Sequence, residues 1–173
     1  GSARIDGARR DDGGLDTRVQ LSELGGTLRT RPLAGHADVQ IRSGAEADAI
    51  TAYEGELSLR LGDSRIEAEG LFADSLRVDA DFSPLHLADL LPDAGGTLRG
   101  RLQLRGRRDA PDIDVDLSGA ELQYGNWRAG TLLARGKLPW RAAGAAAGNL
   151  HLEGTALALG LPFDTLRADA RGS

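Results

Sequence analysis

The sequence predicts an all-β protein in which amphipathic strands form one elongated sheet. Most segments alternate between aliphatic and charged residues with a period of two, which is typical of strands with one buried and one solvated face. The 173 residues include only 3 Phe, 2 Trp and 2 Tyr and no Met, so the apolar content is aliphatic and evenly spread. Internal repeats indicate an object that grows by repetition.

Two sequence repeats carry that last inference. Gly25–Arg29 (GGTLR) recurs at Gly95–Arg99, and Asp74–Ala80 (DSLRVDA) recurs as DTLRADA at Asp164–Ala170. We therefore expect residues 15–173 to form one continuous β-rich region of about two related units.

The first 14 residues differ from the rest. They are polar, and Arg9–Gly14 is a poor strand former. The chain begins Gly-Ser without Met, as a protease cleavage scar does. We expect residues 1–14 to be partly disordered and to hold a tag remnant, and the chain to be a fragment of a longer protein.

Six segments between residues 15 and 82 alternate between apolar and polar residues. Residues 43–52 (SGAEADAITA) are ambiguous between a loop and a turn of helix, and Gly62-Asp63 predicts a turn. We expect strands over residues 15–21, 27–30, 37–42, 54–61, 65–71 and 75–82.

The periodicity then changes. Ser83 is a suitable N-cap, Pro84 suits the first helical position, and Pro92 ends the apolar run. We expect one short helix near residues 84–91, lying across one end of the sheet.

Residues 95–138 read as four short strands. A hairpin between residues 97–106 and 112–117 brings both aliphatic sets to one face only in certain registers, because a one-residue slip reverses every side chain. The most compact of these registers pairs Leu104 with Ile113, Leu102 with Val115, Arg105 with Asp112 and Arg101 with Asp116.

A second hairpin turns at Gly125-Asn126. The apolar phase slips between Ala129 and Leu132, which predicts a β-bulge at or next to Gly130. Beyond it we expect a flexible loop over residues 141–148 and closing strands over 150–154, 155–161 and 164–170.

Several function classes find no support in the sequence. The chain has 20 Arg and one Lys but a formal net charge of −5, and the Arg residues alternate with acids, so we expect no nucleic-acid partner. It has no Cys, which excludes disulfides and thiolate metal sites. His36, His86 and His151 are isolated, and no GxSxG motif is present. We expect no catalytic residues, no metal, no cofactor and no enzymatic activity.

Four aspartates, Asp109, Asp112, Asp114 and Asp116, resemble a hard-cation cluster. For three of them, a solvated strand face whose carboxylates pair with Arg is the better explanation, since calcium loops also need a turn and backbone carbonyls.

The notable feature is a continuous aliphatic face with almost no helix to cover it. Either two sheets pack as a sandwich, or one sheet curls so that its apolar concave face lines a groove, and the scarcity of bulky side chains favours the groove. The expected groove-lining residues are Leu57, Leu59, Leu61, Ile66, Leu76, Val78, Phe82, Leu98, Leu102, Leu104, Ile113, Val115, Leu117, Leu122, Leu132, Leu138, Leu150, Leu152, Leu157 and Leu159.

Residues 81–138, DFSPLHLADLLPDAGGTLRGRLQLRGRRDAPDIDVDLSGAELQYGNWRAGTLLARGKL, resemble the TamB family within the AsmA-like group of bridge-like proteins. The shared elements are an aspartate-led short helix, the spacing G-G-x-L-x-G-x-L-x-L-x-G and a charged loop ending in Ala-Pro. The resemblance implies a taco-shaped sheet and a periplasmic protein of Gram-negative bacteria, anchored in the inner membrane. It also implies the outer-membrane Omp85-family barrel TamA as a partner and a role in outer-membrane biogenesis.

Three hypotheses follow. The chain belongs to a hydrophobic conduit for phospholipid acyl chains between the membranes, or to a template that pairs its edges with unfolded outer-membrane proteins, including autotransporters. The third is a plain structural β-sandwich with a filled interior.

Overall fold

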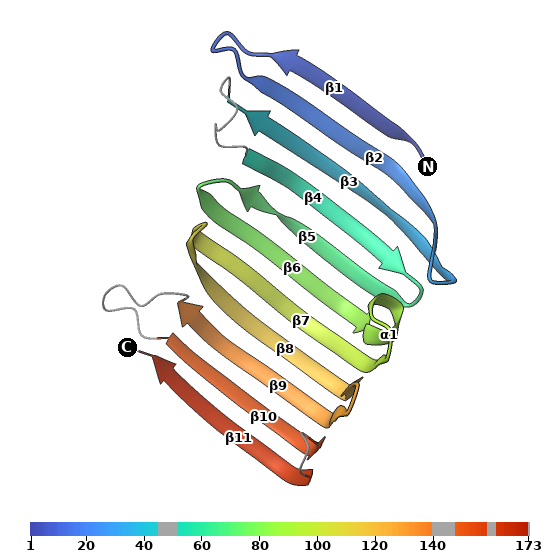
Figure 1. The fold of residues 1–173 in the computed structure, drawn as a ribbon, viewed down its shortest axis with the longest axis vertical. Helices are drawn as coiled ribbons and strands as arrows, with labels where there is room; N and C mark the ends of the chain where they lie inside the picture. Colours follow the sequence, from blue (N-terminus) through green and yellow to red (C-terminus); the bar gives the residue numbers. More distant parts are fainter. Residues whose placement is uncertain (45–51, 140–147, 159–161, 173) are drawn as a thin grey trace.

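The computed structural model describes residues 1–44, 52–139, 148–158 and 162–172, which form a single sheet with one short helix (Figure 1). All eleven strands are antiparallel, and each pairs only with its neighbours in sequence, in the order β1 to β11. The described residues form no second sheet, so the alternative of a β-sandwich is wrong.

Most of the strands are long, and the helix is short. They are β1 (Ala3–Arg9), β2 (Leu15–Leu28), β3 (Arg31–Ser43), β4 (Ala52–Leu61), β5 (Ser64–Phe72), β6 (Ser75–His86), α1 (Leu87–Leu90), β7 (Ala94–Arg107), β8 (Ala110–Tyr124), β9 (Trp127–Pro139), β10 (Gly148–Ala158) and β11 (Pro162–Gly172).

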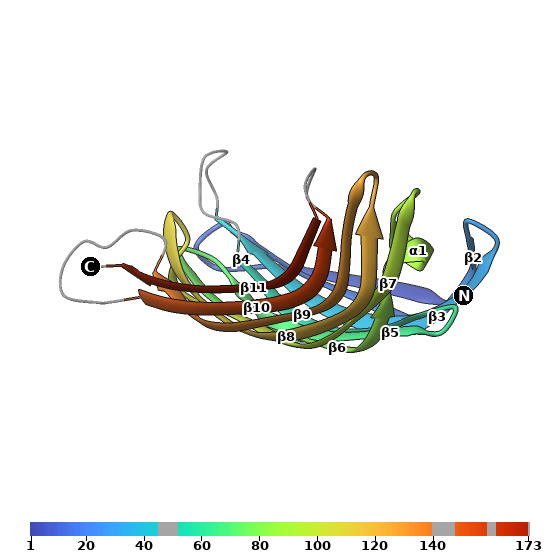
Figure 2. The same cartoon turned by 90° about the horizontal axis from the view of Figure 1, so that it is seen from below.

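The sheet is curled but does not close. Figure 2 shows the strands bowed, with their ends rising on both sides of an open trough. The two outermost strands, β1 and β11, each have one partner strand and do not pair with each other. The predicted elongated, half-pipe sheet is therefore confirmed.

The predicted register of the central hairpin is also confirmed. Leu104 faces Ile113 and Leu102 faces Val115 across the β7–β8 ladder. Tyr124 pairs with Trp127 across the predicted two-residue turn. Parity limits the hairpin to registers that keep both aliphatic sets on one face, and the observed register is the most compact of these.

Several predicted strand boundaries are wrong, because the strands extend beyond the segments in which apolar and polar residues alternate. Residues 95–138 hold three long strands, and 27–28 are the end of β2. Residues 150–158 belong to β10 alone. At the N-terminus, residues 3–9 form β1, which pairs along its whole length with β2. The ladder hydrogen bonds of a neighbouring strand extend each strand through its glycines and polar residues.

The short helix is present, but its predicted start is wrong. Ser83 and Pro84 lie in β6, where a register shift between Phe82 and Leu85 accommodates them, and His86 is the N-cap of α1. The amide of His86 donates to the Ser64 hydroxyl at 2.8 Å, a contact with β5 that holds the chain extended up to this residue.

A buried carboxylate ties α1 to the sheet. Asp89 is 3% exposed, accepts a hydrogen bond from Ser64 Oγ at 2.7 Å and lies 3.3 Å from Arg31 Nε. Gly62 in the β4–β5 turn, at φ +57°, comes so close that an added Cβ would lie 3.2 Å from the Asp89 carboxylate. Because a buried charge without partners is costly, this network fixes α1 at the end of the trough.

The predicted β-bulge at Gly130 is wrong, although the change of apolar phase that predicted it is present. The β8–β9 register is unbroken around it, since Ala120 pairs with Thr131 and Leu122 with Ala129. The phase slip in β9 is instead matched in β8, where Glu121 has a φ of +52°. Both strands change which residues face inward at the same point along the ladder, so neither strand contains an extra residue, as a bulge would require.

Glycine permits the close approach of strands within the sheet. Gly100 in β7 has a φ of +129°, and a Cβ built on it would lie 2.0 Å from the carbonyl oxygen of Asp116 in β8. Any side chain there would push the two strands apart. Gly25 in β2 provides a contrast, because a Cβ at that position would meet nothing within 4 Å.

We expect Gly100→Ala to lower the free energy of unfolding by about 1–3 kcal/mol, the cost of a non-glycine residue in strained backbone, and more if the strands separate. Gly25→Ala, the matched control, should change it by less than about 0.5 kcal/mol. Urea unfolding followed by circular dichroism measures both. Equal effects at the two positions would contradict the close-approach argument.

Candidate functional site

The ladders arrange the aliphatic residues in rows that cross the whole sheet. Residues that pair directly in neighbouring strands share a face, so a chain of pairs defines a row. The central row contains one residue from each strand, and every one is aliphatic or Gly. Its members are Ala3, Leu21, Ala37, Leu57, Ala68, Ala80, Leu102, Val115, Gly136, Leu150 and Ala170.

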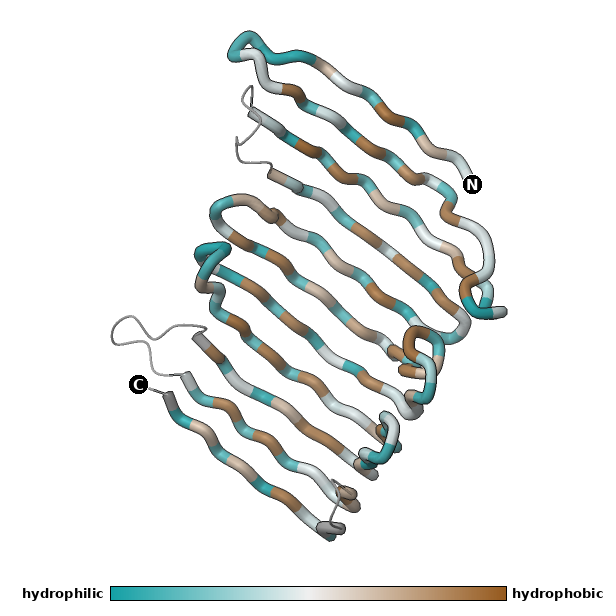
Figure 3. The backbone as a smooth tube through the Cα atoms, in the orientation of Figure 1, coloured by the Kyte–Doolittle hydropathy of each residue, from teal (hydrophilic) through white to brown (hydrophobic). Residues whose placement is uncertain are grey.

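The rows on either side of it are also apolar. One includes Val19, Val39, Val78, Leu104, Ile113 and Leu138. The other includes Leu59, Ile66, Phe82, Leu117 and Leu152. Figure 3 shows the result as brown and teal segments that alternate along the strands. We refer to the face that carries these rows as the inner face.

Of the predicted groove residues, thirteen lie in these three rows and Leu159 lies outside the described residues. Leu61, Leu98 and Leu132 continue the alternation of their strands toward the α1 end. Leu76 pairs with Phe72 and Gly106 near the opposite end. The phase change described above returns Leu122 and Leu157 to the same side, since both line one apolar pocket with Leu132.

The prediction missed the first third of this face. Leu21, Val39 and Ile41 from β2 and β3 belong to it, and the alternation that predicted those strands was a sufficient signal. Ala68 and Ala80 were also missed, because alanine is a weak marker of an apolar face. They lie between Leu57 and Leu102 in the central row.

Exposure varies from place to place over the inner face. Val115 is 9% exposed and Leu76 7%. Leu57 and Leu166 remain 36% and 40% exposed. In the part of the chain that the structure describes, no second layer covers this face.

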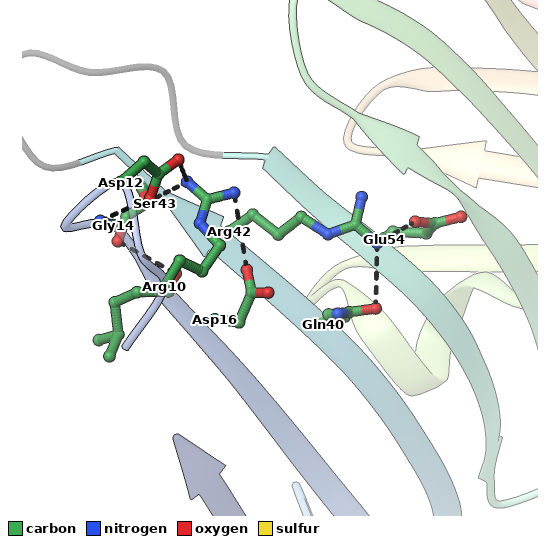
Figure 4. Close-up of polar contacts among 9 residues, drawn as sticks. Arg10, Asp12, Gly14, Asp16, Gln40, Arg42, Ser43 and Glu54 are labelled. Carbon is green, nitrogen blue, oxygen red and sulfur yellow. Dashed lines mark hydrogen bonds and ion pairs between the residues drawn. The ribbon is translucent and has the colours of Figure 1, made fainter. Parts of the chain in front are cut away.

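The opposite, outer face is held by ion pairs between strands. Figure 4 shows its β1–β4 end, where Arg10 contacts Asp12 and Asp16, and Arg42 lies 3.4 Å from Glu54. These contacts join the β1–β2 turn to β2 and join β3 to β4. Each exposed pair contributes little stability, about 0–1 kcal/mol, so their main effect is on register.

The ion pairs predicted for the central hairpin form with other partners. Arg105 faces Asp112 in register but its guanidinium contacts Asp79 of β6 at 3.0 Å. Asp116 likewise contacts Arg135 of β9 at 2.8 Å. A strand inside a sheet has two neighbours, and the alternation within one hairpin cannot show which neighbour its charges select.

His151 occupies the outward strand position expected for it. Its Nδ1 lies 2.6 Å from Asp169 Oδ1 of β11, and this hydrogen bond lowers the pKa of Asp169. Among the described residues, no three His, Asp or Glu side chains are grouped so that they could hold a metal ion.

The best-defined polar contact of the outer face joins β2 to β3. Arg18 donates to both carboxylate oxygens of Asp38, at 2.9 and 2.6 Å, and Gln20 donates at 2.9 Å. The hydrogen bonds from Arg18, which have the largest effect, and from Gln20 lower the pKa of Asp38 from its ordinary 3.8 to about 2. The same contact raises the pKa of Arg18.

Comparison with known proteins gives one family and one relative. The family model described as "TamB, N-terminal domain" matches residues 1–173. The translocation and assembly module subunit TamB of Haemophilus influenzae is 22% identical over 109 residues, which are 63% of this chain and 8% of that protein. The chain therefore spans a small part of the relative's length. No solved structure matches.

Within the described ranges the single helix, α1, has four residues, and no helix has the length and apolar character that crossing a membrane requires.

The Asp38 contact makes stability depend on pH. Because its pKa is depressed in the folded state, the contact stabilises the fold above about pH 4, the pKa region of an unfolded aspartate. That contribution should be lost as the pH falls toward 2. Asp38→Asn should flatten the fall of the unfolding free energy over this interval, measured by urea unfolding at a series of pH values.

A carbon NMR titration tests the cause of this shift. Arg18→Gln should return the pKa of Asp38 toward its ordinary value, whereas an unchanged pKa would contradict the assigned hydrogen bonds.

Proposed function

Because this chain belongs to the TamB family, we propose that it acts in outer-membrane biogenesis as a periplasmic segment whose inner face carries phospholipid acyl chains. The family supports the role in outer-membrane assembly, in the envelope of a Gram-negative bacterium. The lipid cargo is inferred from the chemistry of the inner face.

The observation that carries the proposal is the unbroken central row. Leaving apolar surface in water costs about 25 cal/mol per Å², and the described residues provide no layer that covers this face. Strands lie about 4.8 Å apart, so the row runs for about 50 Å along the sheet. A hydrocarbon chain suits such a path because it needs no hydrogen-bond partner at any point.

The absence of polar groups along the central row argues against a cargo that needs them. A peptide lying on Leu102, Val115 and Leu150 would bury its amides against aliphatic carbon, at a cost of several kcal/mol for each unpaired group, about 2–7 kcal/mol. Acyl chains carry no such cost, and they can slide because no position binds them specifically.

We further propose that the full-length protein is anchored in the inner membrane and acts with the outer-membrane barrel TamA. The name of the Haemophilus relative, a translocation and assembly module subunit, supports an assembly partner. The sheet's free edges would allow more strands of the same protein to continue the trough in both directions.

Charge on the inner face should abolish lipid binding. We expect Leu102→Asp and Val115→Asp each to reduce several-fold the phospholipid that co-purifies with the chain, because a carboxylate cannot be buried beside hydrocarbon. Ser118→Asp is the matched control, since Ser118 is an exposed residue of the same strand as Val115. Mass spectrometry of the extracted lipid gives the readout, and circular dichroism verifies that each variant folds.

Two results would contradict this proposal. One is a fragment that carries no lipid when purified without detergent from bacterial membranes. The other is a full-length protein in which the Val115→Asp charge leaves phospholipid transport intact.

A second candidate function rests on the free sheet edges. Each of the outermost strands, β1 and β11, presents one row of backbone groups with which no other strand of the described residues pairs. Such an edge can take up another extended chain by strand addition. In this role the protein would be a template for unfolded outer-membrane proteins, including autotransporters.

Proline distinguishes the template from the conduit. If edge pairing with a client is the function, proline substitutions at outward-facing amides of β1 and β11 should abolish autotransporter assembly and leave bound lipid unchanged. The conduit predicts the reverse sensitivity, to charges on the inner face. Assembly that tolerates every such proline would exclude the template.

A further inference from the structure

A crease crosses four strands near the α1 end of the trough. It runs through Gly96 in β7, Glu121 in β8, Gly130 in β9 and Ala156 in β10. Three of these have positive φ, +89° at Gly96, +52° at Glu121 and +50° at Ala156. The β8–β9 and β9–β10 ladders keep one register on both sides of the crease, so the strands turn together.

The crease changes which residues face inward. In β9, the next inward residue beyond the crease is Ala129. It lies three positions before Leu132, whereas strict alternation would place the next inward residue two positions before it. In β10, Leu157 is likewise inward and lies three positions after Gly154. Figure 2 shows the orange ends of β8 and β9 rising steeply from the sheet. We call these raised ends, residues 122–124, 127–129 and 157–158, the lip.

A pocket of about 360 Å³ lies in the angle between the lip and the floor of the trough. Leu122, Ala129 and Leu157 line it from the lip, and Leu132, Leu152 and Leu166 line it from the floor. Its walls are almost wholly apolar. Its volume falls within the roughly 300–1,000 Å³ of small-molecule sites.

Two aromatic residues stand at the rim of this pocket. Tyr124 and Trp127 pair directly at the tip of the β8–β9 hairpin and also line the pocket. Their exposures are 63% and 65%, the largest after Ile5 among the bulky apolar and aromatic residues that the structure describes. Each ring has an apolar body and one polar group, the combination found where hydrocarbon meets water and lipid headgroups.

We infer that this pocket binds one acyl chain of a phospholipid, with the glycerol and headgroup at the rim beside Tyr124 and Trp127. The inference rests on the proposed function and adds a place at which a lipid enters or leaves the trough from the side. The apolar walls favour this ligand over a peptide, because a buried amide would find no partner there.

The rim tryptophan can report on the pocket directly. The chain contains only one other tryptophan, Trp140, so Trp140→Phe leaves Trp127 as the sole emitter. We would add vesicles of phosphatidylethanolamine and phosphatidylglycerol that carry bromine on the acyl chains, with unbrominated vesicles as the control. Bromine quenches tryptophan only at short range, so we expect the Trp127 emission to fall several-fold with the brominated lipid alone.

Two variants test whether quenching depends on the pocket. Ala129→Phe fills it without adding charge, and Leu157→Asp makes it polar. Each should restore most of the emission. Because Leu157→Asp risks misfolding, Ala129→Phe with an unchanged circular dichroism spectrum is the decisive variant. Quenching that persists in folded Ala129→Phe would overturn the inference, as would displacement of the lipid by an apolar peptide.

The amount of bound lipid separates this inference from the proposed function. If lipid co-purifies with the chain but the brominated vesicles do not quench Trp127, the entry site is overturned and the trough is left intact. A chain that neither carries lipid nor shows quenching would overturn both.

Discussion

The structure depends on the parity with which ten ladders pair their strands along the central row. In a single-layer sheet, the side-chain period of two means that a slip of one residue in any ladder would turn a whole strand's leucines to the outer face. The central row is unbroken from Ala3 to Ala170 because every ladder keeps this parity. Side chains on both faces help to hold it. Aliphatic neighbours such as Leu102 and Val115 meet on the inner face, and the contacts of Asp38 and Arg135 span strands on the outer face.

Curvature is the second requirement, and small residues provide it. A curled sheet brings its concave side chains together, so some positions must have none. Gly100 and Gly136 occupy such positions in the inner rows, each with a carbonyl oxygen of the next strand 2.0 Å from where a Cβ would lie. Together with the crease, they allow a sheet without a packed second layer to form a trough, and they leave its hydrophobic surface available to a ligand.

The parts that could be predicted from the sequence depend on parity within one strand or one hairpin. The pairing of Leu104 with Ile113 and the turn after Tyr124 are of this kind. The start of α1 could not be predicted, because Ser83-Pro84 has every local feature of a helix start. The contact that keeps the chain extended comes from Ser64 in the neighbouring strand β5, 22 residues before His86. The partners of Arg105 depended in the same way on a strand outside its hairpin.

The candidate site shows the same division. Its aliphatic residues were visible as alternation, and the phase slip at Gly130 was visible in β9. That β8 and β10 change phase at the same level was not, because Glu121 and Ala156 are ordinary residues whose backbone is set by their neighbours. The pocket in the crease could therefore not be predicted, although the residues that line it from β8 to β11 lie in predicted strands.

The most direct test of the central claim is photo-crosslinking along β8 of the full-length protein in living cells. A photoreactive amino acid would replace each residue from 112 to 117 in turn, and the adducts would be identified by mass spectrometry. We expect phospholipid adducts at Ile113, Val115 and Leu117 and none at Asp112, Asp114 and Asp116, because only the former lie on the inner face. Adducts without this period of two, or adducts to protein at the inner positions, would contradict a lipid-carrying inner face.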